Sequence, residues 1–260
     1  MRCLAGLVCV LALGFMPLVG CSDSESAGGS AGDGGSAGVG GGGVGGDGGT
    51  GDTAARFVSL RGYDPDGIVQ LEAVELCELD TTSCVITDAG GLASLELPTE
   101  GEVAYTAQKE GWTPAIFMEV MSPDSPSLRG LLMLPEGYVA EQHERVGSPY
   151  PMQGTGTLQV EIEPDFDGVT LELMSATGTA WYLDEGPVWS TDLVATSDSF
   201  AAIGGFTEVT PGVVEVKLGG TAAQGCTPTG AWPAEAENTL RVLVREGYLT
   251  TAVSTCPGPQ

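Results

Sequence analysis

The sequence predicts an all-β protein in which two β-sandwich domains follow one another after a Gly-rich tether. After residue 56, short runs of alternating apolar and polar residues are separated by Gly, Pro and Asp, which is typical of half-buried strands. Helical periodicity is scarce in the same region. Similar turns and strands recur in the two halves, and this favours two copies of one sandwich over a single irregular domain.

Residues 1–20 have the pattern of an export signal. Arg2 is the only charged residue before Cys21, and an apolar run extends from Leu4 to Leu18. The run is shorter than the apolar stretch of about 20 residues that a transmembrane helix needs. A basic start, an apolar middle and a small residue before the cleavage point are typical of a secretory signal.

Residues 18–21, Leu-Val-Gly-Cys, resemble the lipobox of bacterial lipoproteins. The resemblance implies cleavage before Cys21, a diacylglyceryl thioether on its sulfur and usually a third acyl chain on its amine. Each buried methylene contributes about 0.8 kcal/mol, so two or more chains anchor a protein stably. Ser22 follows where an Asp would imply retention in the inner membrane, so the resemblance favours the outer membrane. The alternative is an ordinary cleaved signal with a cysteine there by chance.

Residues 21–55 are expected to be the lipidated cysteine and a disordered tether. The segment consists almost entirely of Gly, Ser, Ala, Asp and Thr and has no aromatic residue. Such a composition cannot bury enough surface to offset the entropy lost on ordering. A Gly-rich coil of this length reaches about 30 Å.

The charge balance excludes some classes of partner. The chain has 35 acidic and 9 basic side chains and a formal net charge of −26. Nucleic-acid binding needs clustered Lys and Arg to neutralise phosphates, so no nucleic-acid partner is expected. Direct electrostatic adsorption to anionic lipid is also disfavoured. A large negative charge is instead expected to keep the protein soluble and to make its copies repel one another.

Four cysteines remain after the signal and the lipobox: Cys77, Cys84, Cys226 and Cys256. An even number in an exported protein indicates disulfides. Four cysteines allow three pairings, and we favour Cys77 with Cys84 and Cys226 with Cys256 because each bridge then stays within one domain. A zinc site is the alternative, but no C-x₂-C spacing occurs and the chain has a single histidine.

We expect the first sandwich over residues 56–135, a connector over 136–154 and the second sandwich over 155–260. The connector should contain a short helix over 135–146, which begins with Pro and Glu and ends with Arg before a Gly. His143 lies on the polar face of this helix and is expected to be solvated. A single histidine there does not indicate a catalytic triad.

Turns recur between the two halves. Residues 64–67, Asp-Pro-Asp-Gly, and residues 165–168, Asp-Phe-Asp-Gly, each precede a strand. Residues 109–112, Lys-Glu-Gly-Trp, and residues 245–248, Arg-Glu-Gly-Tyr, each lead into another apolar strand. We therefore match these turns between the copies.

The turns and strands together resemble the carboxypeptidase regulatory-like domain. The matching segments are residues 64–67, 87–92 (Thr-Asp-Ala-Gly-Gly-Leu), 95–98 (Leu-Glu-Leu-Pro) and 109–112, then 196–201 (Thr-Ser-Asp-Ser-Phe-Ala) and 206–212. The resemblance covers about residues 56–120 and 155–255. It implies a prealbumin-like or Ig-like seven-stranded sandwich that is structural or ligand-presenting and has no catalytic residues.

Trp181, Tyr182 and Trp189 are the candidate glycan contacts, because they flank a loop and exposed aromatic rings can bind the faces of sugars. Burial in a sandwich core is the alternative for any such ring.

Asp64, Asp66, Asp165 and Asp167 are weak candidates for calcium ligands, since paired carboxylates occupy matching turns. Calcium needs 6–8 oxygens and no EF-hand spacing is present. Asp-x-Asp-Gly is also ordinary turn chemistry, so no cofactor is expected beyond this calcium candidate.

The sequence thus predicts a non-enzymatic, lipid-anchored protein of the bacterial envelope. Its expected partners are the membrane, through Cys21, and an envelope protein or polysaccharide. Its two sandwiches would serve binding, adhesion or scaffolding. The alternative is a carbohydrate-binding accessory lipoprotein of a polymer-degrading system. A hydrolase is disfavoured, because a carboxylate pair also needs a cleft and a raised pKa on one member.

Overall fold

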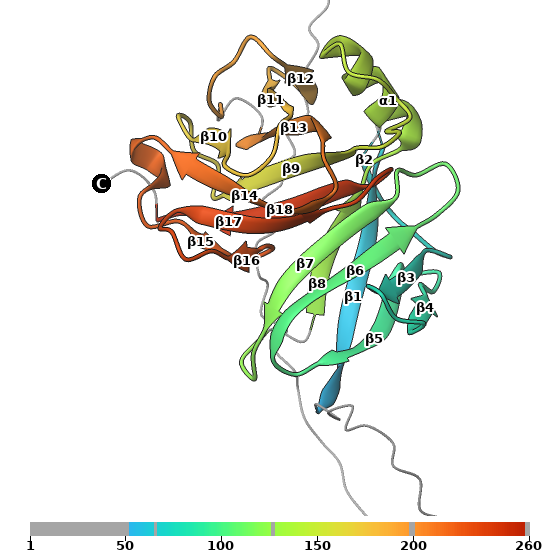
Figure 1. Cartoon of the computed structure of the whole chain (residues 1–260). Coiled ribbons are helices and arrows are strands. Elements are labelled where there is room, and N and C mark those ends of the chain that lie inside the picture. The colour runs from blue at the N-terminus through green and yellow to red at the C-terminus, as the bar shows by residue number, and fades with distance from the viewer. Residues whose placement is uncertain (1–51, 65–66, 126–127, 198–200, 258–260) are drawn as a thin grey trace, which may run out of the picture. The chain divides into compact units, whose positions relative to one another are not determined.

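The computed structural model describes residues 52–64, 67–125, 128–197 and 201–257 (Figure 1). The predicted signal, Cys21 and most of the tether lie outside these residues. The first strand begins at Thr53, inside the predicted tether. Within the described residues the chain is all-β apart from one α-helix and one 3₁₀ turn, so the predicted fold class is confirmed.

The first half contains eight strands: β1 (Thr53–Asp64), β2 (Gly67–Gln70), β3 (Glu75–Glu78), β4 (Cys84–Ile86), β5 (Leu92–Pro98), β6 (Gly101–Gln108), β7 (Ala115–Met121) and β8 (Leu128–Met133). The second half contains α1 (Glu136–Arg145), β9 (Gly156–Glu163), β10 (Thr170–Leu173), β11 (Thr179–Asp184), β12 (Val188–Ser190), β13 (Ile203–Val209), β14 (Gly212–Gly219), η1 (Thr221–Ala223), β15 (Thr227–Pro228), β16 (Trp232–Pro233), β17 (Thr239–Val244) and β18 (Leu249–Thr255).

The first sandwich packs the strands β5-β1-β8, with β2 beside β1, against the strands β4-β3-β6-β7. Period-two patterning sets the inner face of each strand: in β5, Ala93, Leu95 and Leu97 are buried and their neighbours are exposed. The buried residues of β1, β5, β6, β7 and β8 form one apolar core.

The second sandwich repeats the pairing scheme of the first. Strand β9 pairs antiparallel with β13 and parallel with β18, as β1 pairs antiparallel with β5 and parallel with β8. The second sheet, β10-β14-β17, corresponds to β3-β6-β7. The two halves therefore have the same core topology, as a duplicated sandwich requires.

A threonine in each half makes the same three hydrogen bonds. The Thr87 hydroxyl donates to the Leu71 carbonyl at 2.7 Å and accepts from the Val74 amide at 2.9 Å, while the Thr87 amide donates to the Val74 carbonyl. The Thr196 hydroxyl donates to the Phe166 carbonyl at 2.7 Å and accepts from the Val169 amide at 3.1 Å, and its amide donates to the Val169 carbonyl. The repeat is thus visible in side-chain contacts.

One match that we made between the halves is wrong. The turn at residues 109–112 leads into β7, and the turn at 245–248 leads into β18. By strand pairing, however, the counterpart of β7 is β17 and the counterpart of β18 is β8. The two turns have similar sequences because both precede a buried strand, but they occupy different places in the sandwich.

The two sandwiches share one sheet. Residues 249–251 of β18 pair in parallel with residues 115–117 of β7. The result is a ten-stranded sheet with nine strands on the path β12-β11-β13-β9-β18-β7-β6-β3-β4 and the tenth, β15, beside β18 (Figure 1). The two faces of β7 serve different cores, since Phe117 packs in the first sandwich and Ile116 and Met118 pack in the second.

Helix α1 packs over the end of the shared sheet that is formed by β11 and β12. It matches the helix expected in the connector, and its Val139 packs with Leu134, Leu249 and the β11–β12 hairpin in a third apolar cluster. The Tyr138 hydroxyl donates to the Pro187 carbonyl at 2.6 Å. The connector is therefore packed against both halves.

An insertion between β14 and β17, residues 220–238, covers the edge of β17. Its strand β16 pairs with Leu240 and Arg241 of β17, and its strand β15 pairs with β18. The Cys226–Cys256 disulfide joins the insertion to the chain just after β18. In the first sandwich the equivalent edge, that of β7, is occupied by β18.

Candidate binding surface

The three aromatic side chains that we assigned to glycan contact are buried. Trp181, Tyr182 and Trp189 are 0 %, 3 % and 3 % exposed, so the expectation of exposure is wrong. The Trp181 and Trp189 rings stack with centroids 3.9 Å apart in the cluster beneath α1. Gly205 in β13 makes room for this, since a Cβ there would lie 2.6 Å from the Trp181 ring.

His143 is also buried, against our expectation of a solvated side chain. Its exposure is 0 %, and its two ring nitrogens lie 3.1 Å from the Pro149 carbonyl and 3.0 Å from the Thr157 hydroxyl. Burial lowers the pKa of this imidazole. His143 therefore packs α1 against the sheet as a neutral side chain at neutral pH.

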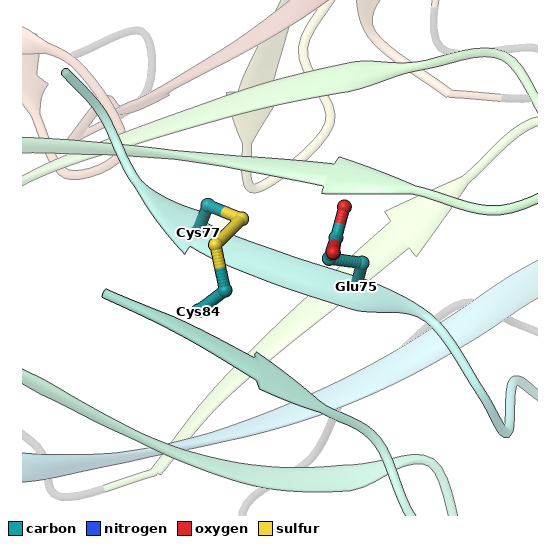
Figure 2. A group of neighbouring side chains, drawn as sticks. All are labelled: Glu75, Cys77 and Cys84. Atoms are coloured by element: carbon teal, nitrogen blue, oxygen red, sulfur yellow. A yellow bond between two sulfur atoms is a disulfide. The ribbon is translucent and has the colours of Figure 1, made fainter. Parts of the chain in front are cut away.

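Both predicted disulfides are confirmed, as Cys77 bonds to Cys84 and Cys226 bonds to Cys256. Among the described residues, the only three-member group with metal-ligand geometry is Glu75 with Cys77 and Cys84. Figure 2 shows that the two sulfurs of this group are bonded to each other. A disulfide sulfur is not the thiolate that a metal needs, so we assign the group to the β3–β4 hairpin.

The calcium candidates are described only in part. The side chain of Asp64 and all of Asp66 lie outside the described residues. Asp165 Oδ1 accepts a hydrogen bond from the Ala202 amide at 2.9 Å, which is a structural role for one of the four carboxylates. Calcium binding at these turns stays a prediction.

A buried charge cluster crosses the first sandwich, and sequence reasoning missed it. Arg56 of β1 and Glu119 of β7 are 3 % and 4 % exposed and form an ion pair between the two sheets. The Tyr105 hydroxyl donates to Glu119 Oε1 at 2.6 Å. Burial, and then the Glu119 charge, raise the pKa of Tyr105. The feature of the sequence that could have revealed this cluster is Glu119, the charged residue in the otherwise apolar run of residues 115–121.

Glu161 of β9 is a second unusual carboxylate. It faces the same side of the shared sheet as its neighbour Glu163, and burial raises its pKa to about 7, with further contributions from Glu163 and Asp165. Arg129 acts in the opposite direction on this pKa.

Three large apolar side chains are exposed on the outer face of β5-β1-β8 in the first sandwich. Phe57, Leu92 and Leu128 are 50 %, 46 % and 55 % exposed. Phe57 is the register partner of Leu128, and Ser59, two residues further along β1, is the partner of Leu92. Because residues two apart share a face, the three side chains form one surface, here called the β1 patch.

A shallow pocket lies at the edge of the second sandwich, lined by Glu215, Pro233, Ala234, Glu235 and Arg241. The Arg241 guanidinium lies 5.8 Å from the centre of the Trp232 ring and pairs with Glu102 at 2.8 Å. Trp232 donates its indole N–H to the Val103 carbonyl at 3.1 Å. These contacts hold the second sandwich and its insertion against the first sandwich. We therefore assign Trp232 and Arg241 a structural role and not a role in ligand binding.

Among the described residues, no helix has the length and apolar character needed to cross a bilayer.

Comparison with known proteins finds no matching family model and no matching curated protein. Three solved structures are similar at 12 % identity: the Bacillus anthracis TIE protein, the minor pilin of Streptococcus agalactiae and a streptococcal ancillary pilin. The matches cover 78 %, 79 % and 78 % of this chain and 34 %, 98 % and 69 % of those chains. This chain thus spans about a third of the TIE protein. The TM-scores are 0.25, 0.23 and 0.24, and likenesses this weak carry no conclusion about function.

Proposed function

We propose that this chain is a non-enzymatic, lipid-anchored protein of the bacterial cell envelope that presents two rigidly joined β-sandwiches for binding, adhesion or scaffolding. The observation that supports the proposal most is the shared sheet, which joins the sandwiches through β7 and β18. A continuous sheet resists bending at the junction, so the chain is suited to present surfaces in a fixed relation.

The lipid anchor is supported by the sequence of residues 18–21 and by the polar composition that follows. We infer acylation of Cys21 and placement in the outer membrane, with an envelope protein or polysaccharide as the partner of the sandwiches. Two disulfides fit an oxidising compartment outside the cytoplasm.

The carbohydrate-binding alternative loses its support, because Trp181 and Trp189 stack on each other inside the protein. No other described feature favours that function over the leading proposal.

Intact-mass measurement of the exported chain tests the anchor. The chain should begin at Cys21 and carry the added mass of two or three acyl chains, and it should fractionate with membranes. Cys21→Ser should release the protein from the membrane fraction without changing its melting temperature. An exported chain with an unmodified Cys21 would overturn the anchor.

The non-enzymatic part of the proposal has its own test. Purified protein should give no turnover on panels of glycan and peptide substrates. Turnover that disappears when a single carboxylate, such as Glu161, is changed to its amide would make the chain an enzyme and refute this part.

A further inference from the structure

The β1 patch is a bare surface whose equivalent in the second sandwich is covered. The Leu60 amide donates to the Gly91 carbonyl at 2.8 Å, and the Ile162 amide donates to the Ala202 carbonyl at 3.0 Å. These matching bonds, with the strand registers, align Phe57 with Gln159.

The same alignment places Leu92 opposite Ile203, and Leu128 opposite Thr251. Gln159 is 8 % exposed, and Ile203 packs against the cluster beneath α1. The second sandwich thus keeps this face under the connector, with largely polar side chains. The first sandwich has apolar side chains at all three of these positions, and each of them is about half exposed.

The face that carries the β1 patch is nearly neutral. Its described outward positions on β1, β5 and β8 include one acidic residue, Glu96, and one basic residue, Arg61. The chain as a whole has 35 acidic and 9 basic side chains. This face can therefore approach an anionic surface with little of the repulsion that the rest of the chain would meet.

The patch lies where the tether meets the fold. Strand β1 begins at Thr53, four residues before Phe57, which is about 13 Å of extended strand. A coil of the length and composition between Cys21 and Thr53 reaches about 30 Å. Such a linker keeps the fold near the anchored Cys21 at roughly millimolar effective concentration. A surface with only weak affinity for the membrane would therefore still be bound to it for much of the time.

We propose that the β1 patch docks on the membrane that holds Cys21, with Phe57, Leu92 and Leu128 entering the boundary between headgroups and acyl chains. The proposal rests on the proposed lipid anchor and adds an orientation to it. A protein surface binds at the boundary between headgroups and acyl chains when its apolar side chains become buried there. A second copy of the chain is the competing occupant, but three side chains offer little area beside the roughly 1,200–2,000 Å² of a stable interface.

The test uses the mature chain, residues 21–260, coupled through the Cys21 thiol to a maleimide lipid. The other four cysteines of the mature chain are in disulfides, so the coupling has one site. The vesicles contain phosphatidylethanolamine and phosphatidylglycerol, with a fraction of the lipid brominated near the headgroup. Brominated lipid quenches tryptophan only at close range.

Phe57→Trp places a reporter in the patch, and Val213→Trp is the matched control. Val213 is also 50 % exposed but lies on β14 of the second sandwich. The emission added by Phe57→Trp should be lost in part in brominated vesicles, whereas the emission added by Val213→Trp should not change. Adding Leu92→Ser and Leu128→Ser to Phe57→Trp should abolish the quenching, with circular dichroism melts confirming that each variant folds.

Equal quenching of the two reporters, or quenching of neither, would overturn the proposal. So would a dimer in sedimentation that Leu128→Ser dissociates, because the patch would then be covered by a second copy. Since the coupling supplies the anchor chemically, these outcomes are independent of natural acylation. An unmodified Cys21 in the exported chain would instead refute the proposed function on which the docking depends.

Discussion

At the scale of single residues, two titratable groups, the buried His143 and the partly exposed Glu161, act on stability in opposite directions as pH changes. The pKa of His143 is lowered by burial, so the stability it contributes is present above its unfolded pKa and is lost as pH falls through the folded value. The pKa of Glu161 is raised to about 7. The stability linked to that group is present below its unfolded pKa, about 4.3, and is lost as pH rises through 7.

Glu161→Gln should therefore stabilise the protein at alkaline pH and have little effect near pH 4. The amide has no charge to desolvate, so the variant should gain on the order of 1–2 kcal/mol at pH 8, discounted for the partial exposure of this side chain. Thermal melts of both proteins across this pH range measure the difference. Glu172→Gln, at an exposed position of β10, is the control, and an equal gain there would contradict the explanation.

The buried Arg56–Glu119 pair should show strong non-additivity. Arg56→Met leaves Glu119 buried without its counter-charge and should cost about 3–5 kcal/mol of unfolding free energy. Changing Glu119→Leu in the same chain removes that charge and should recover a large part of the loss, although the Tyr105 hydroxyl then lacks its acceptor. Urea denaturation of the single and double variants gives the coupling. A double variant less stable than Arg56→Met would refute this account.

At the scale of elements, local patterning explains what could be predicted from the sequence. The alternation in β5 and β9 is a local signal, and so are the acidic first turn and basic last turn of α1. The elements that these signals predict are present. The disulfides followed from keeping each bridge within one sandwich. What failed was non-local: whether Trp181 or His143 is covered depends on the connector folding back over the sheet.

Removal of the two disulfides should lower the free energy of unfolding by different amounts. Cys226–Cys256 closes a sequence separation of 30 and Cys77–Cys84 closes one of 7. In the chain-entropy model the longer loop contributes about 1 kcal/mol more. Paired Cys→Ser variants at each bridge, compared by thermal melting under oxidising conditions, should therefore show the larger loss for Cys226 and Cys256. A larger loss for the short hairpin would show that strain or packing outweighs loop entropy.

At the scale of the whole molecule, the shared sheet couples the two sandwiches through the pairing of β7 with β18. The boundaries that we placed at residues 135 and 154 came from the helix signals over residues 135–146 and the Gly- and Pro-containing stretch that follows. Such local signals carry no information on how strands pair across a boundary. In the folded protein, β7 contributes side chains to both cores. The described residues from 52 onward belong to one compact unit.

Heat unfolding of the mature chain should therefore be a single cooperative transition. The calorimetric and van't Hoff enthalpies should agree, as they do for a two-state unit. A cavity variant of the first sandwich, such as Leu95→Ala, should lower the midpoint of that one transition by removing a fully buried side chain. Two resolved transitions, with only one of them displaced by Leu95→Ala, would mean that the sandwiches melt independently.

The covered edge of β17 limits how such a chain can lengthen in evolution. The first sandwich offers β7 to the sandwich that follows it, whereas Trp232 and Pro233 already occupy the corresponding place in the second. A third module fused after Thr255 would find the edge of β17 occupied by β16, and Pro233 has no amide hydrogen with which to continue the ladder. Tandem growth by this joint is closed at two modules unless the segment between β14 and β17 is lost.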